Sequence, residues 1–389
     1  MAARLEPPIP QHSTEGKPMS QIINLQANHV NSANAESIEN KLGWIRRRSD
    51  RQFINPDSLL DHLQERSARS TTDLRENAEI EVIANDQPRT MDEMNAVTML
   101  VNGQELDFSH WSFGQLCQLA KAPAGFLRSL PGMLVRDNLD YALKHNREVE
   151  QVKLYHDDTH LRAITGPKYG RVDDAEVVEA VQTILDGGRW VPAEKHMGLR
   201  VSDRSLNMFL IDRENPIVIG KAPNGADDIM WRGLRISNSE VGYSSLKVEG
   251  FTFRDYCLNG CIFGMRESET IHIRHSLNAP HRWAREVQPA IERYANQDAI
   301  TFVQAVEAAQ SAKVADDNDK ALAWLNNRGL TAKQARAAIE RVQVEEGRDP
   351  RTAWDMVQGV TAIARKVAHV EERADLERIG GKIFERVAA

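Results

Sequence analysis

The spacing of apolar positions changes from one region of the chain to the next. Residues 1–35 show no periodicity and are rich in Pro, Ser and Asn, so we expect a disordered leader there. Residues 36–145 carry helical spacing, and Ser112 with Gln115 forms a capping-box pattern ahead of one apolar stripe. This spacing predicts a mainly helical N-terminal region.

The middle of the chain, residues 146–280, changes to a period of two. The stretch VKLYHDDTHLRAI predicts a β-hairpin that turns at Asp157 and Asp158. A helix is predicted after it, capped by Asp173 or Asp174 and stopped by a pair of glycines. Four later stretches have the alternation of strands: LNMFLID, GLRISN, SSLKVEGFTFRDYC and TIHIRH. We therefore predict a sheet-rich core with one inserted helix.

Helical spacing returns in residues 281–389. Pro289 predicts a kink or a boundary in the first helix, and Thr331 with Gln334 predicts the capped start of another. From Thr301 onward, 14 acidic residues balance 14 basic ones, as in a solvated helical bundle. The predicted fold is thus α+β, an antiparallel sheet-rich central domain with a helical region before it and a helical C-terminal part.

Composition narrows the class of protein. The 389 residues are 41% hydrophobic and 27% charged, and no run of about 18 apolar residues predicts a membrane span. Three cysteines cannot all pair, and the first residues lack the apolar core of a secretory signal, so we expect reduced thiols in a cytoplasm. The net charge of −7 is uneven, because residues 57–95 hold ten acidic and four basic residues. A positive surface elsewhere is compatible with that total.

Two short clusters raise the question of a metal. Cys257 and Cys261 have zinc-like spacing, and His272 and His275 could complete the set. Histidines three apart on a strand point to opposite faces, however, so two strands joined through an Asn-Gly turn are favoured over zinc. In HDDTH, residues 156–160, hairpin-turn chemistry is likewise favoured over metal binding.

Motifs for nucleophilic catalysis and cofactor binding are missing from the sequence. We find no G-x-S-x-G elbow, no phosphate-binding loop of the Walker type, and no G-x-G-x-x-G after a strand. The sequence therefore predicts no catalytic residue and no cofactor, and it leaves open whether any reaction is catalysed.

Cations and aromatic side chains recur on the predicted sheet. Cations neutralise phosphates and aromatic faces stack on bases, which is the usual surface for single-stranded nucleic acid. The alternative is ordinary strand residues whose charged ends reach water. The basic stretch LGWIRRRSDR, residues 42–51, is favoured as a solvated loop, with a phosphate or partner contact as the alternative. The residues predicted to bind nucleic acid are Lys153, Arg162, Lys168, Tyr169, Arg171, Arg254, Tyr256, Arg274 and His275.

Several stretches occur together in a recognisable order: LCQLAKAPAGFLRSLP, LRAITGPKYGRVDDAEVVEAV, ISNSEVGYSSL, the CLNG turn, and IRHS before a long helix. Over residues 105–345 the chain resembles a family of phage- and plasmid-encoded proteins of unknown function. The resemblance implies a mobile-element setting and no established activity. Proteins of such elements often serve replication, recombination, annealing of single strands, or protection from host defence.

The leading hypothesis is a non-catalytic DNA-transaction protein that binds single-stranded DNA or RNA through its central sheet. A homo-oligomer assembled through the helical C-terminal part fits the same hypothesis. Two alternatives stay open. One is a metal-dependent enzyme acting on nucleic acid through HDDTH or the Cys/His stretch. The other is an antagonist of a host defence factor, in which the acidic segment 57–95 mimics the charge of DNA.

Overall fold

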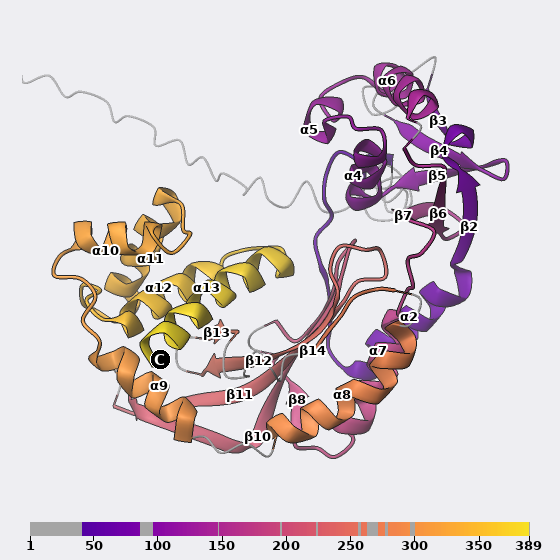
Figure 1. Ribbon diagram of the computed structural model, residues 1–389. Coiled ribbons are helices and arrows are strands. Elements are labelled where there is room, and N and C mark those ends of the chain that lie inside the picture. Colours follow the sequence, from indigo (N-terminus) through magenta and orange to yellow (C-terminus); the bar gives the residue numbers. More distant parts are fainter. Residues whose placement is uncertain are drawn as a thin grey trace, which may run out of the picture.

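The chain folds into a mixed α+β structure with three parts (Figure 1). These parts are an N-terminal lobe, a curled antiparallel sheet in the middle that we call the central sheet, and a C-terminal bundle of helices. The predicted fold class is confirmed. The computed structural model describes residues 41–85, 96–146, 148–194, 197–222, 225–255, 258–262, 271–276, 279–295 and 300–388.

The N-terminal lobe is built on a six-stranded sheet with the order β2-β6-β7-β5-β4-β3. The predicted hairpin is confirmed, because β6 and β7 form an antiparallel pair. Strands β2 to β5 were not predicted from the sequence, because they lie in residues 36–145, for which the apolar spacing predicts a mainly helical region. The strands are β2 (Thr71–Glu76), β3 (Glu81–Ala84), β4 (Val97–Val101), β5 (Gln104–Phe108), β6 (Gln151–His156) and β7 (His160–Thr165).

Helices α4 (His110–Leu119), α5 (Ala124–Leu127) and α6 (Gly132–His145) complete the lobe and share its apolar core. Helix α4 begins earlier than predicted: Ser109 is its N-cap and forms a capping box with Ser112. Gln115 is therefore an interior residue of the helix. The side-chain amide of Gln115 instead forms hydrogen bonds with other segments. It accepts from the backbone N–H of Ile164 and donates to the carbonyl of Val241.

The central sheet has eight antiparallel strands in the order β1-β9-β10-β11-β12-β13, with β8 paired to β10 and β14 paired to β12. The four stretches predicted as strands are confirmed as β10, β11, β12 and β14. The strands are β1 (Arg51–Phe53), β8 (Trp190–Pro192), β9 (Leu199–Val201), β10 (Leu206–Lys221), β11 (Asp227–Asn238), β12 (Leu246–Arg254), β13 (Asn259–Cys261) and β14 (Ile271–Ile273).

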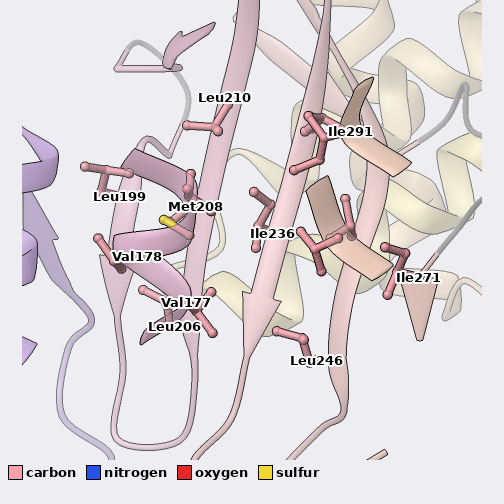
Figure 2. Close-up of a cluster of buried hydrophobic side chains, with 14 of the residues drawn as sticks. Val177, Val178, Leu199, Leu206, Met208, Leu210, Ile236, Leu246, Ile271 and Ile291 are labelled. Atoms are coloured by element: carbon pink, nitrogen blue, oxygen red, sulfur yellow. The ribbon is translucent and has the colours of Figure 1, made fainter. Parts of the chain in front are cut away.

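One face of the central sheet is covered by α2 (Pro56–Arg69), α7 (Asp174–Leu185) and α8 (Ala279–Ala295). Leu206, Met208 and Leu210 alternate along β10 and reach this core, as Figure 2 shows. Pro289 lies inside α8, so it does not end the helix.

The opposite face of the central sheet receives the C-terminal bundle. Phe209, Phe251 and Phe253 point to this side and pack with Val370 at the start of α13. The predicted capping box of Thr331 and Gln334 is confirmed at the start of α11. None of the described helices is long and apolar enough to cross a bilayer. The bundle consists of α9 (Ile300–Ser311), α10 (Asn318–Asn326), α11 (Ala332–Glu345), α12 (Ala353–Ala364) and α13 (Val370–Ala388).

Candidate nucleic-acid interface

A groove of about 250 Å³ lies between the N-terminal lobe and the edge of the central sheet. Its walls come from the chain before β1, from α2, from the start of α4, from the β6–β7 hairpin and from the end of β9. We call it the arginine groove, because its lining includes Arg46, Arg48, Arg51, Arg66 and Arg162.

The pKa values of two histidines in the groove wall are lowered by burial and by nearby positive charge. Partial burial and the nearby arginines, Arg51 and Arg66 among them, lower the pKa of His62 to about 4. Burial and Arg128 with Arg204 lower the pKa of His110 to about 4 as well. Both imidazoles are therefore neutral at pH 7, and each can donate a hydrogen bond without adding charge.

The acidic side chains on the groove wall are already engaged. Asp157 accepts hydrogen bonds within its own turn, from the backbone N–H groups of Thr159 and His160 at 2.8 Å. Asp203 lies 3.3 Å from Arg47 and 3.0 Å from Arg204. The exposed arginines at the mouth consequently set the sign of the potential, which favours anions.

Behind the groove, four charged side chains form a buried network around Glu240. Its carboxylate accepts from Arg162 at 2.7 Å and from Arg66 at 2.9 Å, and Arg66 also binds Asp174 at 2.8 Å. Burial opposes the charge on Glu240, but the two arginines outweigh it and lower the pKa of this carboxyl. We call Arg66, Arg162, Asp174 and Glu240 the Glu240 cluster.

Glu240 also completes the N-terminus of α7. Asp173 is the N-cap residue, as one of the two predicted options, but its side chain makes no capping bond. Instead Glu240 accepts the backbone N–H of Asp174 at 2.8 Å. The Asp173 carboxylate binds Arg171 at 2.6 Å. A residue 66 positions away thus replaces the local cap.

A second hollow of about 240 Å³, the polar cavity, lies on the other side of the Arg162–Glu240 pair. The amine of Lys153 lies in the wall of this cavity and donates a hydrogen bond to the backbone carbonyl of Tyr169 at 3.0 Å. The Arg171 guanidinium stacks over the Tyr155 ring at 3.9 Å and donates to Thr72. The cavity is lined by Thr72, Lys153, Tyr155, Thr165, Tyr169, Arg171, Asp173 and Glu240.

The structure brings several of the predicted nucleic-acid-binding residues into one neighbourhood. Lys153, Tyr169 and Arg171 line the polar cavity, whereas Arg162 lines the arginine groove. His275 stacks on the Tyr169 ring with 5.2 Å between centroids. Two further members of the predicted set are exposed beside these rings, namely Lys168 and Arg274.

Arg254 does not join this neighbourhood. Its side chain is 3% exposed and lies on the bundle face of β12, where it binds Asp228 at 2.6 Å and Glu346 at 2.7 Å. An arginine held in this way is structural and is not available to a polyanion. Tyr256 lies outside the described residues. The nine predicted side chains therefore do not share one wet surface.

The described residues of the Cys/His stretch give no support to the metal hypothesis. The Cys261 thiol faces the carbonyl of Glu377 in α13 at 3.6 Å, while His272 is exposed on edge strand β14 and contacts Ser245. His275 turns to Tyr169, and Cys257 lies outside the described residues. Within the described part of the chain, no three His, Cys, Asp or Glu side chains are placed to hold a metal ion.

The HDDTH stretch forms the turn that its aspartates predicted. The hydrogen bonds from Thr159 and His160 lower the pKa of Asp157 despite its partial burial. His156 approaches Asp73 at 3.1 Å on the neighbouring strand. The side chains of Asp157 and His156 therefore form hydrogen bonds within the hairpin and to the neighbouring strand β2.

The acidic segment 57–95 is built into the fold where it is described. Residues 57–84 supply α2, β2, the 3₁₀ helix Asn77–Glu79 and β3. Asp57 accepts a hydrogen bond from Gln182 of α7, and Glu76 accepts one from Gln151 of β6. Residues 86–95 lie outside the described part.

The structure defines an α+β protein whose curled antiparallel sheet is flanked by a mixed lobe and a helical bundle. A family model matches residues 163–379, more than half of the chain, and the chain belongs to this family, described as "Domain of unknown function (DUF932)". No curated protein and no solved structure matches the chain. The matched region covers the central sheet except β1 and most of the bundle, and it begins within β7.

Sequence reasoning found part of the arginine groove. Arg46, Arg48 and Arg51 lie in the basic stretch 42–51, for which a phosphate contact was the less favoured interpretation. Arg66 and Glu240 were missed, because no adjacent residue in the sequence marks either of them as part of a site. Their roles arise only where α2, β7 and the turn after β11 meet.

Proposed function

We propose that this protein binds single-stranded nucleic acid through the arginine groove, without catalysing a reaction, as a DNA-transaction protein of a phage or plasmid. The observation that carries the proposal is the convergence of three exposed arginines, Arg46, Arg48 and Arg51, on one groove of a chain whose net charge is −7. Arginine binds phosphate oxygens in a planar, bidentate geometry, so such a wall suits a phosphodiester backbone. The mobile-element setting comes from the resemblance alone.

The dimensions of the groove favour a single strand. A cavity of about 250 Å³ lies below the roughly 300–1,000 Å³ of typical small-ligand sites, so it holds only a few chemical groups at a time. Such a space admits a phosphate group of a flexible single strand, whereas a duplex can only lie across its mouth. Neutral His62 and His110 add polar, flat rings for contact with sugar or base.

The test is a fluorescence-anisotropy titration of a labelled, unstructured oligonucleotide at low salt. The groove variant carries Arg46→Ala, Arg48→Ala and Arg51→Ala, three exposed side chains of the wall. We expect it to bind about a hundredfold more weakly, from roughly 1 kcal/mol for each lost phosphate contact. The matched control removes three exposed charges elsewhere, through Arg213→Ala, Lys333→Ala and Arg336→Ala, and should bind as the wild type does.

The salt dependence of the same titration supplies a second readout. Each phosphate contact on a single strand contributes about 0.7 to the slope of log K against log salt. The groove variant should therefore show a slope shallower by about 2, and the control variant should keep the original slope. Absence of binding by the wild type at low salt, or equal losses in both triple variants, would refute the proposal.

A homo-oligomer assembled through the C-terminal bundle belongs to the same proposal. Light scattering coupled to gel filtration measures the mass of the particle directly. A mass equal to one 389-residue chain at micromolar concentration would remove this element and leave the binding proposal intact.

A further inference from the structure

The polar cavity is separate from the arginine groove and has its own set of donors. It is bounded by β2, β6, β7, the segment after β7 and the turn after β11. The Arg162–Glu240 ion pair stands between the two hollows, because Arg162 lines the groove and Glu240 lines the cavity. A ligand in the cavity would not need to enter the groove.

Hydrogen-bond donors in the cavity exceed the acceptors that remain open. The Lys153 ammonium has three N–H donors, and one of them is directed to the carbonyl of Tyr169. Thr72 and Thr165 add hydroxyl groups to the wall. Both oxygens of Glu240 already accept hydrogen bonds, from Asp174 on one side and from Arg66 and Arg162 on the other.

The ion pairs around the cavity leave the Lys153 ammonium with a neutral partner. The wall carries two cations, Lys153 and Arg171, and two carboxylates, Asp173 and Glu240. Glu240 is paired with Arg66 and Arg162, and Asp173 is paired with Arg171. Lys153 donates to a backbone carbonyl, so an anion that enters the cavity can pair with this amine, and its cost of desolvation is offset by the amine and by Arg171.

The shape of the wall selects a small anion without an aromatic body. The Tyr155 ring is covered by Arg171 at 3.9 Å and Arg162 at 4.8 Å. The Tyr169 ring stacks on His275, and the backbone of Gly242 approaches its edge. His275 covers one face of Tyr169, and Tyr155 is buried beneath the two guanidinium groups, so recognition rests mainly on charge and hydrogen bonds.

We propose that the polar cavity is a binding site for a phosphate group, either free phosphate or the phosphate of a small aliphatic ester, held by Lys153, Arg171 and the hydroxyls of Thr72 and Thr165. This site is independent of the proposed binding of nucleic acid in the groove.

Isothermal titration calorimetry of the full chain tests this site, with inorganic phosphate and glycerol phosphate as probes at constant ionic strength. We expect saturable binding of the probes, and adenosine monophosphate should bind no more tightly than glycerol phosphate. Lys153→Met should weaken phosphate binding by about ten- to a hundredfold, the range expected for a lost charged hydrogen bond. Thr165→Val, which preserves the shape of the side chain, should weaken it by a smaller factor.

Two controls separate this proposal from the one for the groove. Lys144→Met removes an exposed lysine of the same lobe and should leave phosphate binding unchanged. The triple arginine variant of the groove should bind phosphate normally, while Lys153→Met should bind the oligonucleotide normally. No saturable binding of phosphate by the folded wild type, unchanged binding by Lys153→Met, or loss of phosphate binding in the groove variant would each overturn the assignment.

Discussion

Glu249 is held between the central sheet and the C-terminal bundle. The side chain belongs to β12 and accepts from Arg235 of β11 and from Arg378 of α13, the latter at 2.9 Å and 3.0 Å. Burial disfavours the charged form, but the two arginines outweigh it and lower the pKa of Glu249 to about 2. A carboxyl whose pKa falls on folding stabilises the folded state at any pH above its unfolded pKa.

This pKa gives a prediction with a defined sign. The stabilisation by Glu249 should be complete above pH 4.5 and should decline as the pH falls from 4.5 towards 2. Glu249→Gln should lower the free energy of unfolding by about 3 kcal/mol at pH 7, and its difference from the wild type should shrink over that acidic range. Urea denaturation at a series of pH values measures both quantities.

Glu214→Gln is the matched control, because Glu214 is exposed on β10. Its effect on the free energy of unfolding should stay within about 0.5 kcal/mol at every pH. A Glu249→Gln difference that is constant between pH 7 and pH 3 would contradict the assignment of the ion pairs.

Residue types could be predicted at the site, but their partners could not. Arg162 and Arg254 both stand out in the sequence as cations on strands. One lies beside a groove and the other beneath a helical bundle, because the face that each strand presents depends on the packing of distant elements. Glu240 shows the same limit, since it meets Arg66 across 174 residues of sequence.

At the scale of elements, helices α11 and α12 approach unusually closely at Gly359. A Cβ atom at this position would lie 2.6 Å from the carbonyl oxygen of Ala338 and 3.0 Å from Val342. The first of these contacts is to backbone, which cannot swing aside as a flexible side chain does. Glycine is therefore required here by the packing of one helix against the other.

Gly359→Ala should destabilise the protein by about 1–3 kcal/mol, the usual cost of overpacking a core. Helix propensity alone would give the opposite sign, because alanine favours helices by about 1 kcal/mol over glycine. Gly114 in α4 supplies the control: its nearest neighbour to an added Cβ is the end of Arg128 at 3.7 Å. Gly114→Ala should thus be neutral or stabilising, and thermal unfolding of both variants would show whether the signs differ.

Elements that carry a local sequence signal could be predicted wherever that signal was noticed, and elements without one were missed. The β6–β7 hairpin and the capped start of α11 depend on neighbouring residues, so they were found. Strand β2, TTDLRE, has no buried residue and hence no apolar alternation to detect. The β4–β5 hairpin did have a signal, Asn102-Gly103 with positive φ at both positions, which the helical interpretation of residues 36–145 overlooked.

At the scale of the whole molecule, the N-terminal lobe meets the central sheet through polar contacts around residues 239–241. Tyr169 donates to the carbonyl of Ser239 at 2.8 Å, and Trp111 donates to the carbonyl of Val241 at 2.9 Å. Glu240, between them, holds Arg162 of the lobe and Arg66 of α2. A small apolar cluster of Tyr155, Ala163, Val241 and Trp111 supports these contacts. Polar interfaces of this kind permit relative motion of the parts that they join.

Glu240→Gln tests whether this one carboxylate couples the two parts. The amide keeps the shape of the side chain but leaves Arg162 without its charged partner and Arg66 with Asp174 alone, at a cost of about 3–5 kcal/mol. Because that cost falls at the junction, we expect faster amide hydrogen exchange in β6 and β7 and at the start of α7, with little change in α12. Glu249→Gln should instead speed amide exchange in the C-terminal bundle, with little change in β6 and β7, since its ion pairs join the sheet to α13. Exchange that rises evenly along the chain in both variants would mean that lobe, sheet and bundle unfold as one cooperative unit.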